Sequence, residues 1–100
     1  MSLNESVSLI ALVYVRARRK MLESENGAYD YPFYILNDCQ KIVHHIDAVI
    51  ESMDEKSRLI LENEVKKGRK GEWYLEYCST TTYYRIREEV YQTFIEELNK

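Results

Sequence analysis

The sequence predicts an all-α single domain of four to five helices. Glycine occurs three times and proline once in 100 residues, which leaves little material for the turns of a sheet. Apolar residues form 45% of the chain and recur at spacings of three and four, the period of one helix face. Because 100 residues suffice for one core, residues 1–100 are expected to fold as one domain.

The first helix is expected over Leu3 to Glu23, with Asn4 or Ser6 as its cap and Asn26-Gly27 as its stop. Its apolar face is formed by Leu3, Val7, Ile10, Tyr14, Ala17 and Met21. Four further apolar residues widen this face, namely Leu9, Leu12, Val13 and Val15. A small domain has little surface to cover so wide a face, so we expect a homodimer with Leu3 to Met21 near the interface.

Ala28 to Tyr34 contains the only proline and four aromatics, and we expect an ordered connector packed on the helices. A second apolar stripe then predicts a helix over Ile35 to Met53, which completes an N-terminal helical pair over 3–53. Asp54 is the expected N-cap of a third helix, and Lys66-Lys67-Gly68 has the composition of its C-terminus.

The last part of the chain holds a short element and a long helix. Glu72 to Tyr77 is dense in aromatics and is expected to form at most two helical turns. Ser79 is expected to cap the last helix, whose core-facing residues are Tyr83, Ile86, Val90, Phe94 and Leu98. The residues left pointing outward near the helix start are Thr80, Thr81, Tyr84, Arg85 and Glu88. Tyr83 is therefore expected in the core and Tyr84 outside it.

Residues 54–99 have the order of a helix-turn-helix unit: a supporting helix, a short helix, a tight turn at Cys78-Ser79 and a long helix. The second helix of such a unit inserts its N-terminal turns into the major groove of DNA, where hydroxyl side chains and arginines reach base edges and phosphates. The sequence therefore predicts DNA contacts on the last helix and on the preceding basic turn, from Thr80, Thr81, Tyr84, Arg85, Arg87, Lys66, Lys67, Arg69 and Lys70.

Four stretches, Met53–Glu64, Trp73–Tyr77, Ser79–Val90 and Phe94–Leu98, together resemble a known regulator family. They look like the C-terminal helix-turn-helix of small phage transcription regulators of the ArpU type, which are similar to region 4 of sigma-70 factors. Small uncharacterised mollicute proteins end in a comparable pattern. The resemblance implies DNA or RNA polymerase binding in transcription control, with the recognition-helix start matched by Thr80, Thr81, Tyr84, Arg85 and Arg87.

The charge of the chain favours a second interpretation. The net charge is −3, and residues 54–100 hold nine basic against ten acidic side chains, a net of −1. Any contact with a polyanion must therefore come from local cations. The alternative is a protein-interaction module that docks on a partner such as RNA polymerase through the first helix and the cluster of Trp73, Tyr74 and Tyr77.

Catalytic, metal and membrane functions have no support in the sequence. It lacks a glycine-rich phosphate loop, a nucleophile elbow and a paired-carboxylate signature, so we expect no enzyme and no cofactor. His44 and His45 point about 100° apart on a helix and are expected to be solvated, with no metal. Cys39 and Cys78 are expected to stay thiols in the cytoplasm. The longest apolar run, Leu9 to Val15, is too short to span a membrane.

Overall fold

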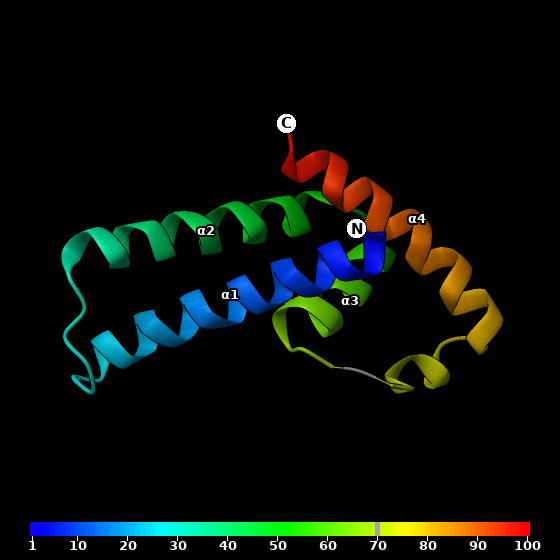
Figure 1. The fold of residues 1–100 in the computed structure, drawn as a ribbon. Helices are drawn as coiled ribbons and strands as arrows, with labels where there is room; N and C mark the ends of the chain where they lie inside the picture. The colour runs from blue at the N-terminus through cyan, green and yellow to red at the C-terminus, as the bar shows by residue number, and fades with distance from the viewer. Residues whose placement is uncertain (70) are drawn as a thin grey trace.

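The computed structural model describes residues 1–69 and 71–100, and helices are the only regular structure in this part of the chain. The elements are α1 (Leu3–Glu25), α2 (Phe33–Ser52), α3 (Glu55–Leu61), the π-helical turn η1 (Glu62–Lys66), the 3-10 turn η2 (Trp73–Glu76) and α4 (Thr80–Leu98). Helices α1 and α2 lie side by side and run in opposite directions, and α4 crosses them near the N-terminus (Figure 1). The predicted all-α single domain is confirmed, with four α-helices in the residues that the structure describes.

The first helix begins at Leu3 as expected, but its N-cap lies two residues before Asn4 and four before Ser6. Ser2 is the N-cap, and its hydroxyl accepts a hydrogen bond from the Glu5 backbone N–H at 3.1 Å. The prediction of Asn4 or Ser6 was wrong because Ser2 and Glu5 form the Ser-x-x-Glu pattern of a capping box. The helix ends at Asn26, and Gly27 follows with a positive φ of 72°, as the Asn-Gly pair predicts.

The aromatic connector contacts α1 through Tyr31, but it packs on the helices less closely than the sequence predicts. Tyr29 and Tyr34 are exposed, and Phe33, at 83% exposure, already starts α2. Tyr31 is half-buried and donates a hydrogen bond to the Glu23 carboxylate at 3.0 Å. The ring of Tyr31 also lies 4.4 Å from that of Tyr29. These two rings pack on each other and leave the core to the long helices.

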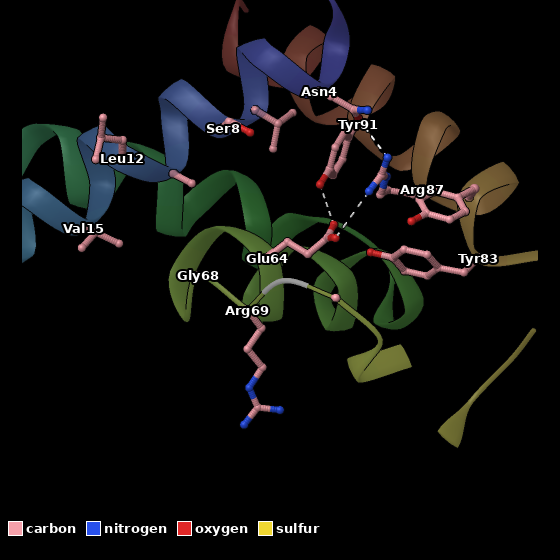
Figure 2. Close-up of a pocket in the computed structure, with 14 residues that line it drawn as sticks. Asn4, Ser8, Leu12, Val15, Glu64, Gly68, Arg69, Tyr83, Arg87 and Tyr91 are labelled. Atoms are coloured by element: carbon pink, nitrogen blue, oxygen red, sulfur yellow. Dashed lines mark hydrogen bonds and ion pairs between the residues drawn. The ribbon is translucent and has the colours of Figure 1, made fainter. Parts of the chain in front are cut away.

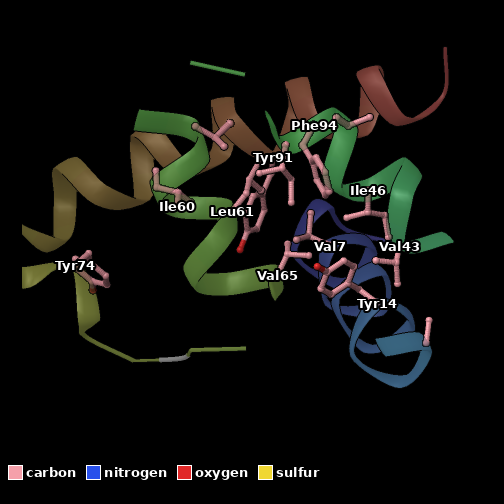
Figure 3. Close-up of a cluster of buried hydrophobic side chains, with 14 of the residues drawn as sticks. Val7, Tyr14, Val43, Ile46, Ile60, Leu61, Val65, Tyr74, Tyr91 and Phe94 are labelled. Atoms are coloured by element: carbon pink, nitrogen blue, oxygen red, sulfur yellow. The ribbon is translucent and has the colours of Figure 1, made fainter. Parts of the chain in front are cut away.

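The core draws one fully buried side chain from each of five elements. These are Tyr14 of α1, Ile50 of α2, Leu61 of α3, Val65 of η1 and Phe94 of α4. Figure 3 shows Leu61, Val65 and Phe94 converging near Tyr14. Since every long element contributes, α4 is part of the same core as the helical pair, and its position is fixed by that core.

The third helix starts as predicted and then continues into a π-helical turn, which is wider than an α-helix. The Asp54 carboxylate accepts the Ser57 backbone N–H at 2.8 Å, which confirms Asp54 as the N-cap. From Glu62 to Lys66 the backbone follows a π-helical turn, an arrangement that is often found at functional sites. The turn buries Val65 and leaves its neighbours Glu64 and Lys66 half-buried, each facing a different helix.

Candidate nucleic-acid interface

The start of α4 is fixed by a local cap. The Ser79 hydroxyl accepts the Thr82 backbone N–H at 3.3 Å, which confirms Ser79 as the residue that opens the last helix. The threonines that follow are weak helix formers, so the cap stabilises a turn that propensity alone would not favour. Thr80 and Thr81 are both exposed in this turn.

Beneath this turn, aromatic side chains hold α4 on the short η2 element. The rings of Tyr74 and Tyr83 stack with centroids 3.7 Å apart and planes within 2°. Trp73 meets Tyr83 edge-on at 5.6 Å. Both tyrosines are buried, whereas Tyr84 is 49% exposed, so the expected inward and outward pair is confirmed. The stack therefore decides which face of α4 is turned to solvent.

The outward face of the first two turns of α4 carries Thr80, Thr81, Tyr84 and Arg85, all exposed. In Figure 1 this end of α4 lies at the edge of the molecule, away from the long α1–α2 pair. A helix end that projects in this way, with hydroxyls and an arginine on its free face, has the shape and chemistry needed to enter a groove of DNA.

Arg87 lies on the inner side of α4, although the sequence analysis grouped it with Arg85. Its side chain is 20% exposed, and one guanidinium nitrogen donates to the Asn4 side-chain oxygen at 3.2 Å. Another lies 3.8 Å from a Glu64 carboxylate oxygen (Figure 2). The guanidinium also sits 4.6 Å from the centre of the Tyr84 ring. Two residues turn a helix by about 200°, so Arg85 and Arg87 point to opposite sides. Arg87 therefore holds Tyr84 and connects α4 to α1.

Glu64 is the partner that sequence reasoning missed. Besides Arg87, it accepts a hydrogen bond from the Tyr91 hydroxyl at 2.5 Å. Burial raises the pKa of Tyr91, and the Glu64 carboxylate raises it further. The only signal in the sequence was a glutamate within the otherwise apolar side of the third helix, between Leu61 and Val65.

Next to this ion pair lies a cavity of about 510 Å³ between α1, α4 and the residues Gly68, Arg69 and Gly71. The Tyr83 hydroxyl reaches it and faces Glu64 without forming a hydrogen bond to any described residue (Figure 2). Burial, followed by the Glu64 carboxylate, raises the pKa of Tyr83. Arg69 and Tyr84 both border this cavity, and in Figure 2 the Arg69 side chain extends away from Tyr83 and Arg87 of α4.

The fold gives the cations of the basic turn different surroundings. Lys66 lies 3.1 Å from the Asp47 carboxylate, which also accepts the Tyr14 hydroxyl at 2.8 Å. Burial lowers the pKa of Lys66, but the bond to Asp47 and nearby negative charge outweigh it, so the pKa is raised. Lys67 and Arg69 are exposed, and the predicted contact residue Lys70 lies outside the described residues.

A second cavity, of about 610 Å³, gathers cations from two parts of the chain. Lys66 and Lys67 line it together with Arg18 and Arg19 of α1. The described cations of the basic turn therefore fall into two groups: Arg69 borders the first cavity, and the two lysines border the second cavity beside α1. The arginines of α1 were missed as neighbours of the lysines because more than 40 residues separate them in the chain.

The structure offers little for metal chemistry in the residues that it describes. His44 and His45 are both exposed on α2, and the His45 Nε2 lies 3.1 Å from the Leu98 carbonyl oxygen. No cluster of three histidine, cysteine or acidic side chains suited to a metal occurs in residues 1–69 and 71–100. Within the same ranges, no helix has the length and apolar character needed to cross a membrane.

Comparisons of the chain with protein-family models, with curated proteins and with solved structures gave no match. The functional assignment therefore depends on the residues of this chain and on the geometry described above.

Proposed function

We propose that the protein is a transcription-associated DNA-binding protein that presents the start of α4 to the major groove. The observation that supports this most directly is the outward cluster of Thr80, Thr81, Tyr84 and Arg85 on a projecting helix end. Arginine binds guanine O6 and N7, and threonine contacts thymine methyl groups or phosphates, so the set suits direct contact with a duplex. The resemblance to ArpU-type regulators supports the same function.

The residues near this face take different roles. Arg85 is the expected base or phosphate contact, and the exposed Arg69 is expected to contact a phosphate. Arg87 is a positioning residue, because its guanidinium is engaged by Glu64 and Asn4. The exposed acidic side chain of Glu88, one turn beyond Tyr84, opposes phosphate binding. Affinity should therefore be modest and strongly salt-dependent, with about three to four phosphate contacts.

The experiment is a fluorescence anisotropy titration of a labelled random-sequence duplex at about 50 mM salt, where electrostatic binding is strong. Arg85→Ala should weaken binding about fivefold to tenfold, the loss expected for one arginine contact. Lys41→Ala removes an exposed cation from α2 and serves as the matched control with unchanged affinity. No binding by the native chain, or equal losses in both variants, would count against DNA as the ligand.

A second candidate function, docking on a protein such as RNA polymerase, is supported by exposed apolar side chains near η2. Leu75 is 49% and Tyr77 is 62% exposed, whereas Tyr74 is buried and Trp73 is half-buried against Tyr83. The expected docking cluster of Trp73, Tyr74 and Tyr77 is thus reduced to Tyr77, with Leu75 two residues before it in the chain. Binding to purified RNA polymerase that is lost in Leu75→Ser and kept in Arg85→Ala would support docking over DNA contact.

A further inference from the structure

The face of α1 that points away from the core carries a regular stripe of exposed residues. Glu5, Leu9, Leu12, Arg16 and Arg19 follow one another at spacings of four, three, four and three. All five are exposed, with Leu9 at 49% and Leu12 at 44%. Alternating spacings of four and three are those of the seam between two packed helices. This outer stripe is separate from the face that carries Val7 and Tyr14 into the core.

The outer stripe is ordered by charge along the helix. Its acidic residue, Glu5, lies in the first turn, the two leucines follow, and Arg16 and Arg19 come after them. A second α1 that ran parallel in register would place arginine against arginine and glutamate against glutamate. An antiparallel second α1 brings opposite charges together. The charge order therefore favours one orientation of a second copy over the other.

One antiparallel register satisfies both the apolar and the charged positions. When Leu9 lies opposite the partner's Leu12, Glu5 lies opposite the partner's Arg16, and the two-fold axis repeats both pairs. Such self-complementarity is what an isologous interface between identical chains requires. The overlap runs from residue 3 to residue 18, about 24 Å of helix.

We propose that the outer stripe of α1 is a homodimer interface in which two copies of α1 pair antiparallel, with Leu9 against the partner's Leu12 and Glu5 against the partner's Arg16. This assigns a face, an orientation and a register to the dimer that the sequence analysis expected. One helix pair is smaller than a standard interface of about 1,600 Å², so the dimer should dissociate reversibly on dilution. The proposal does not depend on DNA binding.

Charge reversal tests the register, with sedimentation equilibrium as the measurement. Glu5→Arg and Arg16→Glu each place like charges opposite one another twice, and each should weaken dimerisation by about tenfold or more. The double variant Glu5→Arg/Arg16→Glu restores opposite charges and should dimerise nearly as well as the native chain. Lys41→Glu, on the exposed surface of α2, is the control and should leave dimerisation unchanged. Thermal unfolding followed by circular dichroism checks that each variant is folded.

Cysteine cross-linking tests the orientation. In a Cys78→Ser background, chains carrying Glu5→Cys are mixed with longer tagged chains carrying Arg16→Cys and oxidised. Antiparallel pairing gives mixed disulfide dimers, because residue 5 of one copy meets residue 16 of the other. Like-with-like dimers in excess over mixed ones would overturn the orientation. A native chain that stays monomeric at millimolar concentration, or a double variant no better than the single ones, would overturn the interface itself.

Discussion

Arg85 and Arg87 are two residues apart in α4 and have opposite surroundings. Arg85 is exposed on the projecting face, whereas Arg87 is mostly buried beside Glu64, Asn4 and the Tyr84 ring. The comparison shows that a cluster of arginines in a sequence does not by itself define a binding surface. Because two residues turn the helix by about 200°, Arg85 faces solvent and Arg87 packs inside the domain.

Tyr83 and Tyr84 differ in the same way as the two arginines. Substituting Tyr83 should cause the largest loss of unfolding free energy. Tyr83→Ala removes the ring that stacks on Tyr74 and leaves a cavity, so the free energy of unfolding should fall by about 3–4 kcal/mol. Tyr84→Ala removes a half-exposed ring and should cost less than about 1 kcal/mol. Urea denaturation measures both. Equal losses would show that the inner and outer faces of α4 are not distinct in solution.

Glu64 and Glu88 allow the same comparison between an inner and an outer residue, here with acidic side chains. Glu64→Ala leaves Arg87 and Tyr91 without their shared acceptor in a half-buried site, so we expect a loss of about 2–3 kcal/mol in unfolding free energy. Glu88→Ala changes an exposed position on α4 and should stay within about 0.5 kcal/mol of the native chain. A loss below about 1 kcal/mol for Glu64→Ala would mean that the ion pair does not hold α4 to η1.

The two arginines themselves should separate stability from binding. Arg87→Ala should lower the unfolding free energy by about 1–2 kcal/mol, because Glu64 stays half-buried without its cation. Arg85→Ala should leave stability within about 0.5 kcal/mol and weaken duplex binding. Denaturation and anisotropy on the same preparations measure both quantities. The opposite assignment, with Arg85 needed for stability, would reverse our description of the two faces.

The caps of α3 and α4 give the smallest effect and a pH signature. Asp54→Ala and Ser79→Ala should each cost about 1 kcal/mol at neutral pH. The backbone N–H of Ser57 holds the pKa of Asp54 below its ordinary value, so the contribution of Asp54 is present above the ordinary aspartate pKa of about 3.9. It is lost as pH falls through the lower folded value, whereas the effect of Ser79→Ala should not change with pH. Stability measured from pH 7 down to about pH 2.5 distinguishes the two caps.

The sequence by itself determined the features that depend on neighbouring residues. The Asp54 and Ser79 caps, the stop at Asn26-Gly27 and the inward Tyr83 beside the outward Tyr84 all follow from hydrogen bonds or helix periodicity within a few residues. For the same reason the all-α single domain was predictable. The outward residues of the candidate interface, Thr80, Thr81, Tyr84 and Arg85, were therefore placed correctly on the surface.

Only the tertiary structure decided which charged side chains stay available for binding a ligand. Arg87 meets Asn4 across 83 positions of the chain, and Lys66 meets Asp47 of another helix. Such pairs depend on how the helices pack, and local periodicity carries no information about them. The exposure of Phe33 and Tyr34 also depends on packing, because a side chain is buried only where another part of the fold covers it. Local chemistry thus defined the helices, and packing decided the role of each cation.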